Sequence, residues 1–177
     1  MTSRHFLSKQ SGISLIEVLV ALLIICIALL GIAKMQALAI GNTKTASSRS
    51  IAAIHAASLS SAMRANKAYW AAGLAPASLQ VSGAVLTDST LNGQATDCVA
   101  SSCVAVEMAS YDLKAWGTAL QQLPSGAGAV ACSTAVGSPI ACSVTVSWDE
   151  RYIGLNQSSL NTAQQKSTQS LVLLVQP

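Results

Sequence analysis

The chain has 177 residues, of which 51% are hydrophobic, 10% are charged and 4% are aromatic, and its formal net charge is +3. Once a membrane segment is subtracted, this length leaves room for one modest domain. Arg4 and Lys9 lie in the first twelve residues, so the rest of the chain is almost neutral. The net charge of the chain therefore gives no support for nucleic-acid binding.

Residues 13–33 form an apolar run in which Glu17 is the only acid. About 20 such residues suffice to cross a bilayer as a helix. Inserting a charged side chain into the membrane costs about 2.5–3.5 kcal/mol at the centre of such a helix and less near its start. An acid in this run therefore indicates a functional role. Glu17 follows Ile13 by one helical turn. A free amine on Ile13, created by cleavage after Gly12, would lie within its reach.

The leader before this run is basic and ends in Gly12, and the residues that follow read ISLIEV. This pattern resembles the class III signal of type IV prepilins and of the pseudopilins of type II secretion. The resemblance implies that a prepilin peptidase cuts between Gly12 and Ile13, that Ile13 is then N-methylated, and that Glu17 guides subunits into a fibre. The chain departs from the pattern at Ile13, where Phe or Met is commoner, and in having no proline in the helix. The alternative is an ordinary secretory signal cut after the apolar core, which leaves Glu17 without a role.

The helix is expected to continue as an amphipathic segment over residues 34–73. Good helix formers dominate residues 34–72, Gly73 supplies a stop, and Pro76 follows. The weakest points are Gly31, Gly41 and residues 43–50. Helical periodicity predicts that one apolar face would cover a sheet. That face contains Ile51, Ile54, Ser58, Ala62, Ala65 and Tyr69, with Leu59 at its edge, and the opposite face contains Arg49, Ser60, Arg64 and Lys67.

His55 lies on the apolar side of this helix and has no Cys or acid one turn away. Packing is therefore favoured over metal binding. Arg49, Arg64 and Lys67 could form a DNA-facing stripe, but no aromatic residues alternate with them for base stacking, so a solvated helix face is favoured.

A globular α+β head is expected over residues 74–177. Residues 74–96 read as a loop region with at most one weak strand at 81–86, and residues 104–123 suit a second helix. Residues 142–148 alternate apolar and polar side chains, as in a half-buried strand, and 127–132 would pair with them as a hairpin. Residues 171–175 are apolar on both faces, which favours a position in the middle of the sheet under the long helix. Residues 157–169 are polar and are expected to be an exposed connection.

Four of the five cysteines, Cys98, Cys103, Cys132 and Cys142, fall in the expected exported part, where disulfides persist, whereas Cys26 lies in the apolar run. A bond from Cys132 to Cys142 across the hairpin is geometrically sensible, and one from Cys98 to Cys103 would close a small loop. Four cysteines allow three pairings, which the sequence leaves open. Zinc is the alternative, but the spacings lack the tight pairs of structural zinc sites.

Three segments carry a closer resemblance: DCVASSC, YDLKAWGTALQQLPSGAGAV and VTVSWDE. They look like the PilV group of minor type IV pilins, also called type IV pilus modification proteins. The resemblance implies a type IV pilin-like fold, with a long N-terminal helix packed on a small antiparallel sheet. It also implies a subunit that primes or joins pilus assembly near the tip with other minor pilins and the major pilin, in support of adhesion and twitching motility. The head would be periplasmic and the helix in the inner membrane until assembly into the fibre.

No catalytic residue, cofactor or metal is expected. Asp149 and Glu150 are adjacent, so they point to opposite faces of a strand, and no Ser/His/Asp arrangement can be built around His55. An enzyme is therefore disfavoured. The closer alternative is a minor pseudopilin of a type II secretion system, which would share the helix and the processing signal. A third possibility is an adhesin or DNA receptor at the pilus tip.

Overall fold

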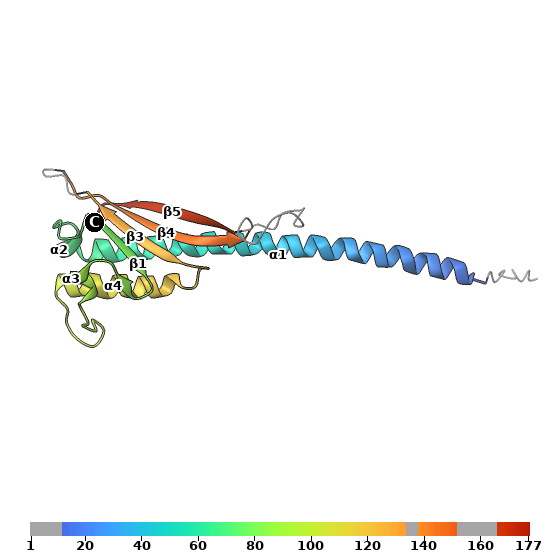
Figure 1. The fold of residues 1–177 in the computed structure, drawn as a ribbon, viewed down its shortest axis with the longest axis horizontal. Helices are drawn as coiled ribbons and strands as arrows, with labels where there is room; N and C mark the ends of the chain where they lie inside the picture. The colour runs from blue at the N-terminus through green and yellow to red at the C-terminus, as the bar shows by residue number, and fades with distance from the viewer. Residues whose placement is uncertain (1–11, 134–137, 152–165) are drawn as a thin grey trace, which may run out of the picture. The chain divides into compact units, whose positions relative to one another are not determined.

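The computed structural model describes residues 12–133, 138–151 and 166–177, whose path Figure 1 follows from blue to red. The chain divides into two compact units, Met1–Asn42 and Thr43–Pro177. Helix α1, Leu15–Ala65, begins in the first unit and ends in the second, and every other helix and strand of the described residues lies in the second. Residues 1–11 of the expected leader lie outside the described part of the chain.

Helix α1 remains helical through Gly31, Gly41 and residues 43–50, where the sequence suggests weak points. The sequence contains no proline before Pro76, so no residue in this stretch lacks a backbone donor. The helix begins at Leu15 and ends at Ala65. The helix expected over residues 13–33 and 34–73 thus begins two residues later and is broken after Ala65.

The end of α1 is set by Asn66, which separates it from the short helix α2, Lys67–Trp70. Asn66 leaves the helical conformation, with φ −105° and ψ 58°. Its side-chain Nδ2 donates a 2.7 Å hydrogen bond to the carbonyl oxygen of Ala105. A short polar side chain that finds a partner elsewhere competes with the helical backbone, which accounts for the break.

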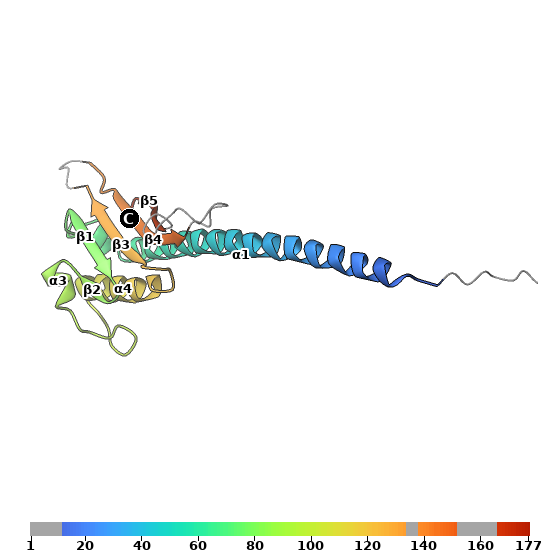
Figure 2. The ribbon, with the colours of Figure 1, turned by 45° about the vertical axis from the view of Figure 1, so that its right-hand side comes forward.

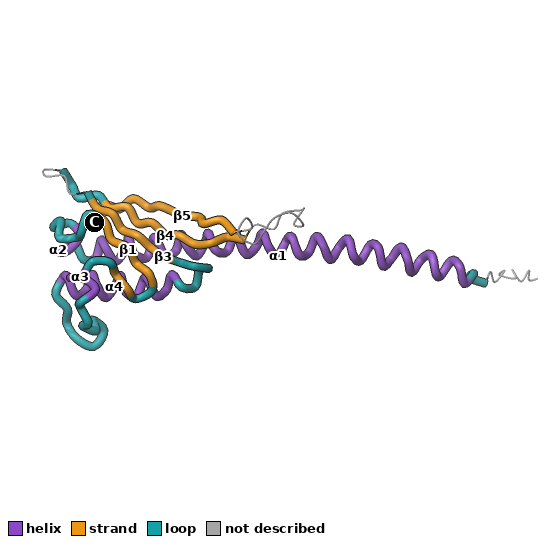
Figure 3. Tube along the Cα trace, viewed as in Figure 1, coloured by secondary structure: helices purple, strands orange, loops and turns teal. Residues whose placement is uncertain are grey.

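The second unit contains a five-stranded antiparallel sheet in the order β2-β1-β3-β4-β5 (Figure 3). Its strands are β1 Ser78–Ser82, β2 Val85–Leu86, β3 Ala127–Cys132, β4 Cys142–Arg151 and β5 Lys166–Val175. One face is buried, as Leu79, Val130 and Val144 show, and the other carries mostly small uncharged side chains. The alternation predicted for residues 142–148 and the hairpin with residues 127–132 are confirmed, with Cys132 directly opposite Cys142.

Residues 81–86, expected as at most one weak strand, form a tight hairpin instead. Ser82 of β1 lies opposite Val85 of β2. The turn between them contains Gly83 at φ +56°, a left-handed conformation that glycine adopts without steric cost. The run is therefore split between two strands.

The prediction that residues 171–175 lie in the middle of the sheet is wrong, because β5 is an edge strand. It is also longer than expected, since its polar first half pairs with the end of β4, from Arg151 opposite Lys166 to Trp148 opposite Gln169. Residues 166–169 are thus strand rather than connection, and residues 157–165 lie outside the described part. Val172 is 59% exposed and Leu174 78%. Here, apolar residues on both faces do not indicate burial on both faces.

Helices α1 and α4, Ala105–Leu120, contribute to the same core as the buried face of the sheet. Figure 2 shows α4 beside β1 and β2, with the small helix α3, Ser89–Asn92, next to it. The second helix predicted at 104–123 is confirmed in place, although it stops three residues early at Leu120. Gly117 of α4 packs so closely on the β1–β2 turn that an added Cβ would lie 2.2 Å from the carbonyl oxygen of Gly83.

The face that α1 buries differs from the predicted one. Its buried residues are Ala52, Ala56, Leu59, Ser60 and Met63. Ile54, expected in the core, is 63% exposed, and Ser60, expected on the solvated side, is 6% exposed. Three of the five buried side chains are small, so burial on this helix follows its contacts with the rest of the head rather than the hydrophobic periodicity.

The architecture confirms the expected α+β class, with a long N-terminal apolar helix and a small antiparallel sheet, as in type IV pilins.

Candidate functional site

Gly12, Ile13 and Ser14 precede α1 and are all exposed. The carbonyl oxygen of Ser14 accepts hydrogen bonds from the backbone nitrogens of Glu17 at 3.0 Å and Val18 at 3.3 Å, and these bonds form the first turn of the helix. Gly12 has no atom within 4 Å of the position that a Cβ would take. The bond between Gly12 and Ile13 therefore lies in an open, non-helical stretch directly before the helix.

Glu17 lies in the first turn of α1. A carboxylate at this position interacts favourably with the positive end of the helix dipole. Ile13 lies outside the helix in the chain as described, so the structure does not show the one-turn relation between Ile13 and Glu17 that a helix starting at residue 13 would give. That relation stays a prediction for the cleaved chain.

The apolar part of α1 is exposed along its whole length, from Leu15 at 86% to Ile32 at 51%. This part of the helix is strongly apolar, and none of its residues is buried. By length and composition the helix can cross a membrane. Cys26, the free cysteine of this segment, is exposed with the rest.

Residues 7–33 match the family model for the prokaryotic N-terminal methylation motif. The N-terminal segment is prepilin-like. The match covers Gly12, Ile13 and Glu17 together with the apolar run. No curated protein and no solved structure matches the chain.

In the head of this prepilin-like chain, the structure joins Cys132 to Cys142. These residues are opposite each other at one end of the β3–β4 ladder, and both are buried. The backbone nitrogen of Ser133 donates a 2.8 Å hydrogen bond to the carbonyl oxygen of Ala141 just beyond them. The disulfide therefore closes the hairpin where its two strands leave the core.

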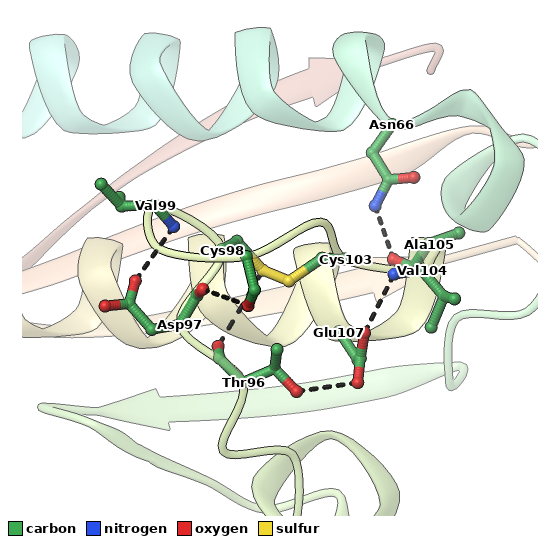
Figure 4. The surroundings of a disulfide bond; sticks show 10 residues. Asn66, Thr96, Asp97, Cys98, Val99, Cys103, Val104, Ala105 and Glu107 are labelled. Carbon is green, nitrogen blue, oxygen red and sulfur yellow. Dashed lines mark hydrogen bonds between the residues drawn. A yellow bond between two sulfur atoms is a disulfide. The ribbon is translucent and has the colours of Figure 1, made fainter.

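The second disulfide joins Cys98 to Cys103 and closes an exposed loop before α4 (Figure 4). Inside the loop, Asp97 accepts hydrogen bonds from the backbone nitrogens of Val99, through its side chain, and of Ser101, through its carbonyl. With both pairs oxidised, none of these four thiols is available to bind zinc. Among the described residues, no group of three or more His, Cys, Asp or Glu side chains could hold a metal ion.

Glu107 fixes the start of α4 below this loop (Figure 4). Its carboxylate accepts hydrogen bonds from the backbone nitrogen of Val104 at 2.9 Å and from the hydroxyl of Thr96 at 2.7 Å. These two bonds, the backbone one above all, hold the pKa of Glu107 below its usual range. Asn66 adds its bond to Ala105, so the end of α1, the disulfide loop and the start of α4 meet at one place.

The adjacent acids Asp149 and Glu150 bind different partners, so they do not form a catalytic pair. Asp149 pairs with Lys166 at 2.6 Å and accepts a hydrogen bond from Thr168 at 2.9 Å. Hydrogen bonds from Lys166, and then from Ser125 and Thr168, lower the pKa of Asp149 to about 2. Glu150 lies on the other face of the strand.

Glu150 receives two 3.0 Å hydrogen bonds from the guanidinium group of Arg49 on α1 and one of 3.1 Å from the indole of Trp148. The Arg49 hydrogen bonds are the main reason why the pKa of Glu150 lies below its usual value. Arg49 thus forms an ion pair with the sheet. It is therefore not available for the DNA-facing stripe of Arg49, Arg64 and Lys67 considered from the sequence. The sequence offers no local signal for this pairing, because 101 residues separate the partners.

His55 is half-buried on α1, and its backbone carbonyl accepts a 2.9 Å hydrogen bond from the indole of Trp116. Arg64 and Lys67 are exposed. The roles of Trp116 and Asn66 were not predicted from the sequence. Each connects α1 or its end to α4 through a side-chain hydrogen bond to a backbone carbonyl. No spacing pattern in the sequence marks such contacts.

Proposed function

We propose that this chain is a minor type IV pilin of the PilV group. It is a structural subunit rather than an enzyme, and it primes or joins pilus assembly near the tip, supporting adhesion and twitching motility. The observation that carries the proposal is the N-terminal methylation motif over residues 7–33, attached through one helix to an α+β head. The proposed segments are a leader at 1–12, a membrane helix at 13–33, its amphipathic continuation at 34–73 and the head at 74–177.

Prepilin peptidase is the first proposed partner. It would cut between Gly12 and Ile13 and methylate the new N-terminus. The open, non-helical stretch before α1 supports this, because a peptidase needs an accessible backbone and a Cβ added to Gly12 would meet no atom within 4 Å.

Glu17 is the proposed assembly residue. Cleavage creates a positive amine on Ile13, and methylation leaves that charge in place. Glu17 would neutralise this amine within its own subunit and then meet the amine of the next subunit in the fibre. An unpaired charge in a membrane is costly, so such a pair favours one axial stagger between subunits.

The other proposed partners are further minor pilins and the major pilin. The chain would first sit in the inner membrane as a single-pass protein with a periplasmic head, and then in the pilus fibre or at its tip. The two disulfides support this location, because such bonds persist in the periplasm and outside the cell. No nucleic acid, cofactor or metal is part of the proposal.

A minor pseudopilin of a type II secretion system is the second candidate. The methylation motif supports both, because the matched residues 7–33 belong to the part that pilins and pseudopilins share. Deleting the gene separates the two: a loss of sheared pili supports the pilin, and a loss of secreted protein with normal pili supports the pseudopilin.

Processing is tested by replacing Gly12. Gly12→Leu should leave the chain at full length in the inner membrane, whereas Gly31→Leu, a matched change outside the cleavage site, should still be cut. N-terminal sequencing of the wild-type mature protein should begin at Ile13. A mature protein that begins after the apolar run would contradict the proposal.

A further inference from the structure

The two edges of the sheet are protected very differently. The β2 edge is two residues long, which leaves little backbone to pair with. The β5 edge is ten residues long, longer than a typical strand of five or six. Among the described residues, only β4 pairs with β5. Every second backbone N–H and C=O of such an edge strand points away from the sheet and is open to another strand.

The β5 edge also lacks the features by which proteins usually block an exposed edge, which are inward charges, proline and bulges. Its ladder with β4 runs through ten consecutive pairs without a bulge. It contains no proline, and its one charged residue, Lys166, stands at the start and pairs with Asp149. Val172 and Leu174 are 59% and 78% exposed.

The outer surface beside the second half of this edge is uncharged. Val172 lies opposite Thr145 of β4, and Leu174 lies opposite Ser143. The matching residues of β3 are Ala129 and Ala131. A partner that covers this area must therefore be uncharged as well, because a charged side chain placed here would lose water without gaining a counter-charge.

The direction of β5 determines which partner fits. Near its start, Ser167 lies opposite Glu150, which is bound to Arg49 in the early part of α1 within this unit. Near its end, Val175 lies opposite Cys142, and Ile140 just before that residue approaches Gly73, which follows α2. Strand β5 therefore runs in the same direction as residues 49–65 of α1, which belong to the same unit (Figure 1).

A second copy of the chain offers no strand for antiparallel pairing with this edge. Antiparallel pairing of β5 with itself needs a two-fold axis perpendicular to the sheet, and this axis would point residues 49–65 of the two α1 helices in opposite directions. Two heads that point the same way in one fibre, as the proposed function requires, cannot adopt that arrangement. The strands that run against α1 are β1 and β4, and both are interior, so neither edge of a second copy offers an antiparallel strand in the correct orientation.

We propose that the β5 edge binds a different membrane-anchored subunit by strand addition, through an uncharged edge strand that runs opposite to that subunit's own N-terminal helix. Main-chain hydrogen bonds would supply the affinity, and Val172 and Leu174 would supply the contact on the outer face. This inference depends on the proposed function, because it assumes that both subunits stand in one fibre with their heads oriented alike.

Hydrogen exchange on the purified full-length protein in detergent tests whether the edge is open. About half of the backbone amides in residues 167–175 should exchange rapidly, because alternate N–H groups of an edge strand point outward. Slow exchange of the whole strand in the isolated protein would mean that the chain covers its own edge, and it would overturn the proposal.

Photo-cross-linking in the native host tests the partner, with p-benzoylphenylalanine at Val172 and, as the control, at exposed Gln80 on interior strand β1. Position 172 should link to a second protein that has its own N-terminal methylation motif. The linked residue of that protein should lie in an uncharged strand. Position 80 should not. Links only to other copies of this chain, or equal linking at both positions, would overturn the proposal.

Charge variants make the test specific to the edge. Leu174→Lys should lower the cross-linked fraction at position 172 about tenfold, because a charge on an exposed edge prevents strand addition. Leu174→Thr, which stays uncharged and favours strand, should keep it, as should Gln80→Lys. Full cross-linking in a Leu174→Lys protein with the wild-type melting temperature would contradict the proposal. If the N-terminus still begins at Ile13, such a result refutes strand addition and leaves the proposed function intact.

Discussion

The indole nitrogen of Trp116 donates a 2.9 Å hydrogen bond to the backbone carbonyl of His55, and so connects α4 directly to α1. The same ring covers β3 so closely that a Cβ on Gly128 would lie 2.2 Å from its Cη2 atom. Trp116 is 5% exposed. One side chain thus fixes the long helix, the second helix and the sheet relative to one another within the second unit.

Trp116→Phe removes the indole donor and keeps a ring over Gly128. We expect a loss of about 0.5–1.5 kcal/mol of unfolding free energy, the usual contribution of one hydrogen bond. Trp116→Ala should cost about 3–5 kcal/mol, because it also leaves a cavity. Thermal or denaturant unfolding of the protein in detergent measures both. Equal losses for Phe and Ala would show that the hydrogen bond, rather than the ring, carries the contact.

Gly117→Ala should destabilise the head, although alanine is the better helix former. Its Cβ would lie 2.2 Å from the carbonyl oxygen of Gly83, a backbone atom that cannot move aside without opening the β1–β2 hairpin. Gly31→Ala is the control, because Gly31 has no atom within 4 Å of its Cβ position and is also helical. There the substitution should be neutral or favourable by up to about 1 kcal/mol. Equal melting temperatures for the two variants would contradict the close packing.

The two disulfides should differ in their effect on stability. Closing a loop of about ten residues contributes somewhat under about 3 kcal/mol in the chain-entropy model, and the shorter loop contributes less. The double change Cys132→Ser and Cys142→Ser should therefore lower the melting temperature of the oxidised protein more than Cys98→Ser and Cys103→Ser. The first pair also lies in the core, and the second closes an exposed loop. The opposite order would show that the loop before α4 organises the head.

Stability should fall in acid through Asp149. Its pKa is about 2 in the folded chain against an ordinary value of 3.8, so its contribution is complete above about pH 4 and is lost as the pH falls towards 2. Glu150, whose folded pKa is also lowered, acts in the same direction. Asp149→Asn should flatten the dependence of melting temperature on pH between 4 and 2. Lys166→Met removes the partner that lowers the pKa of Asp149 most, and it should flatten the dependence in part. An unchanged slope in both variants would exclude this ion pair as the cause.

Glu17→Ala should leave membrane insertion and cleavage intact and reduce incorporation into fibres. Alanine keeps the helix propensity, but the charged amine of Ile13 is left without a counter-charge where helices pack. The measurement compares processed protein in the membrane with protein in sheared pili. Glu17→Asp, which keeps the charge on a shorter side chain, is the matched variant and should retain more incorporation. Wild-type incorporation of the Ala variant would show that Glu17 does not recruit subunits.

The features that the sequence by itself determined are those encoded over short stretches. The basic leader, Gly12, Glu17 and the apolar run lie within 34 residues, and the alternation in residues 142–148 directly marks a strand with one buried face. The hairpin that brings Cys132 opposite Cys142 follows from two such strands. Local periodicity fixes these features because the physical cause, one face meeting water and the other a core or a membrane, acts on neighbouring residues.

Only the tertiary structure decided which face α1 buries, where it breaks and where β5 lies. Ala52 and Ser60 are buried while Ile54 is exposed, because contacts with the rest of the head, and not the hydrophobicity of each residue, decide which side of the helix is covered. The break at Asn66 depends on the carbonyl of Ala105, 39 residues away. The edge position of β5 depends on the pairing order of all five strands. Each of these outcomes is a contact between segments distant in sequence, and no pattern within one segment specifies such a partner.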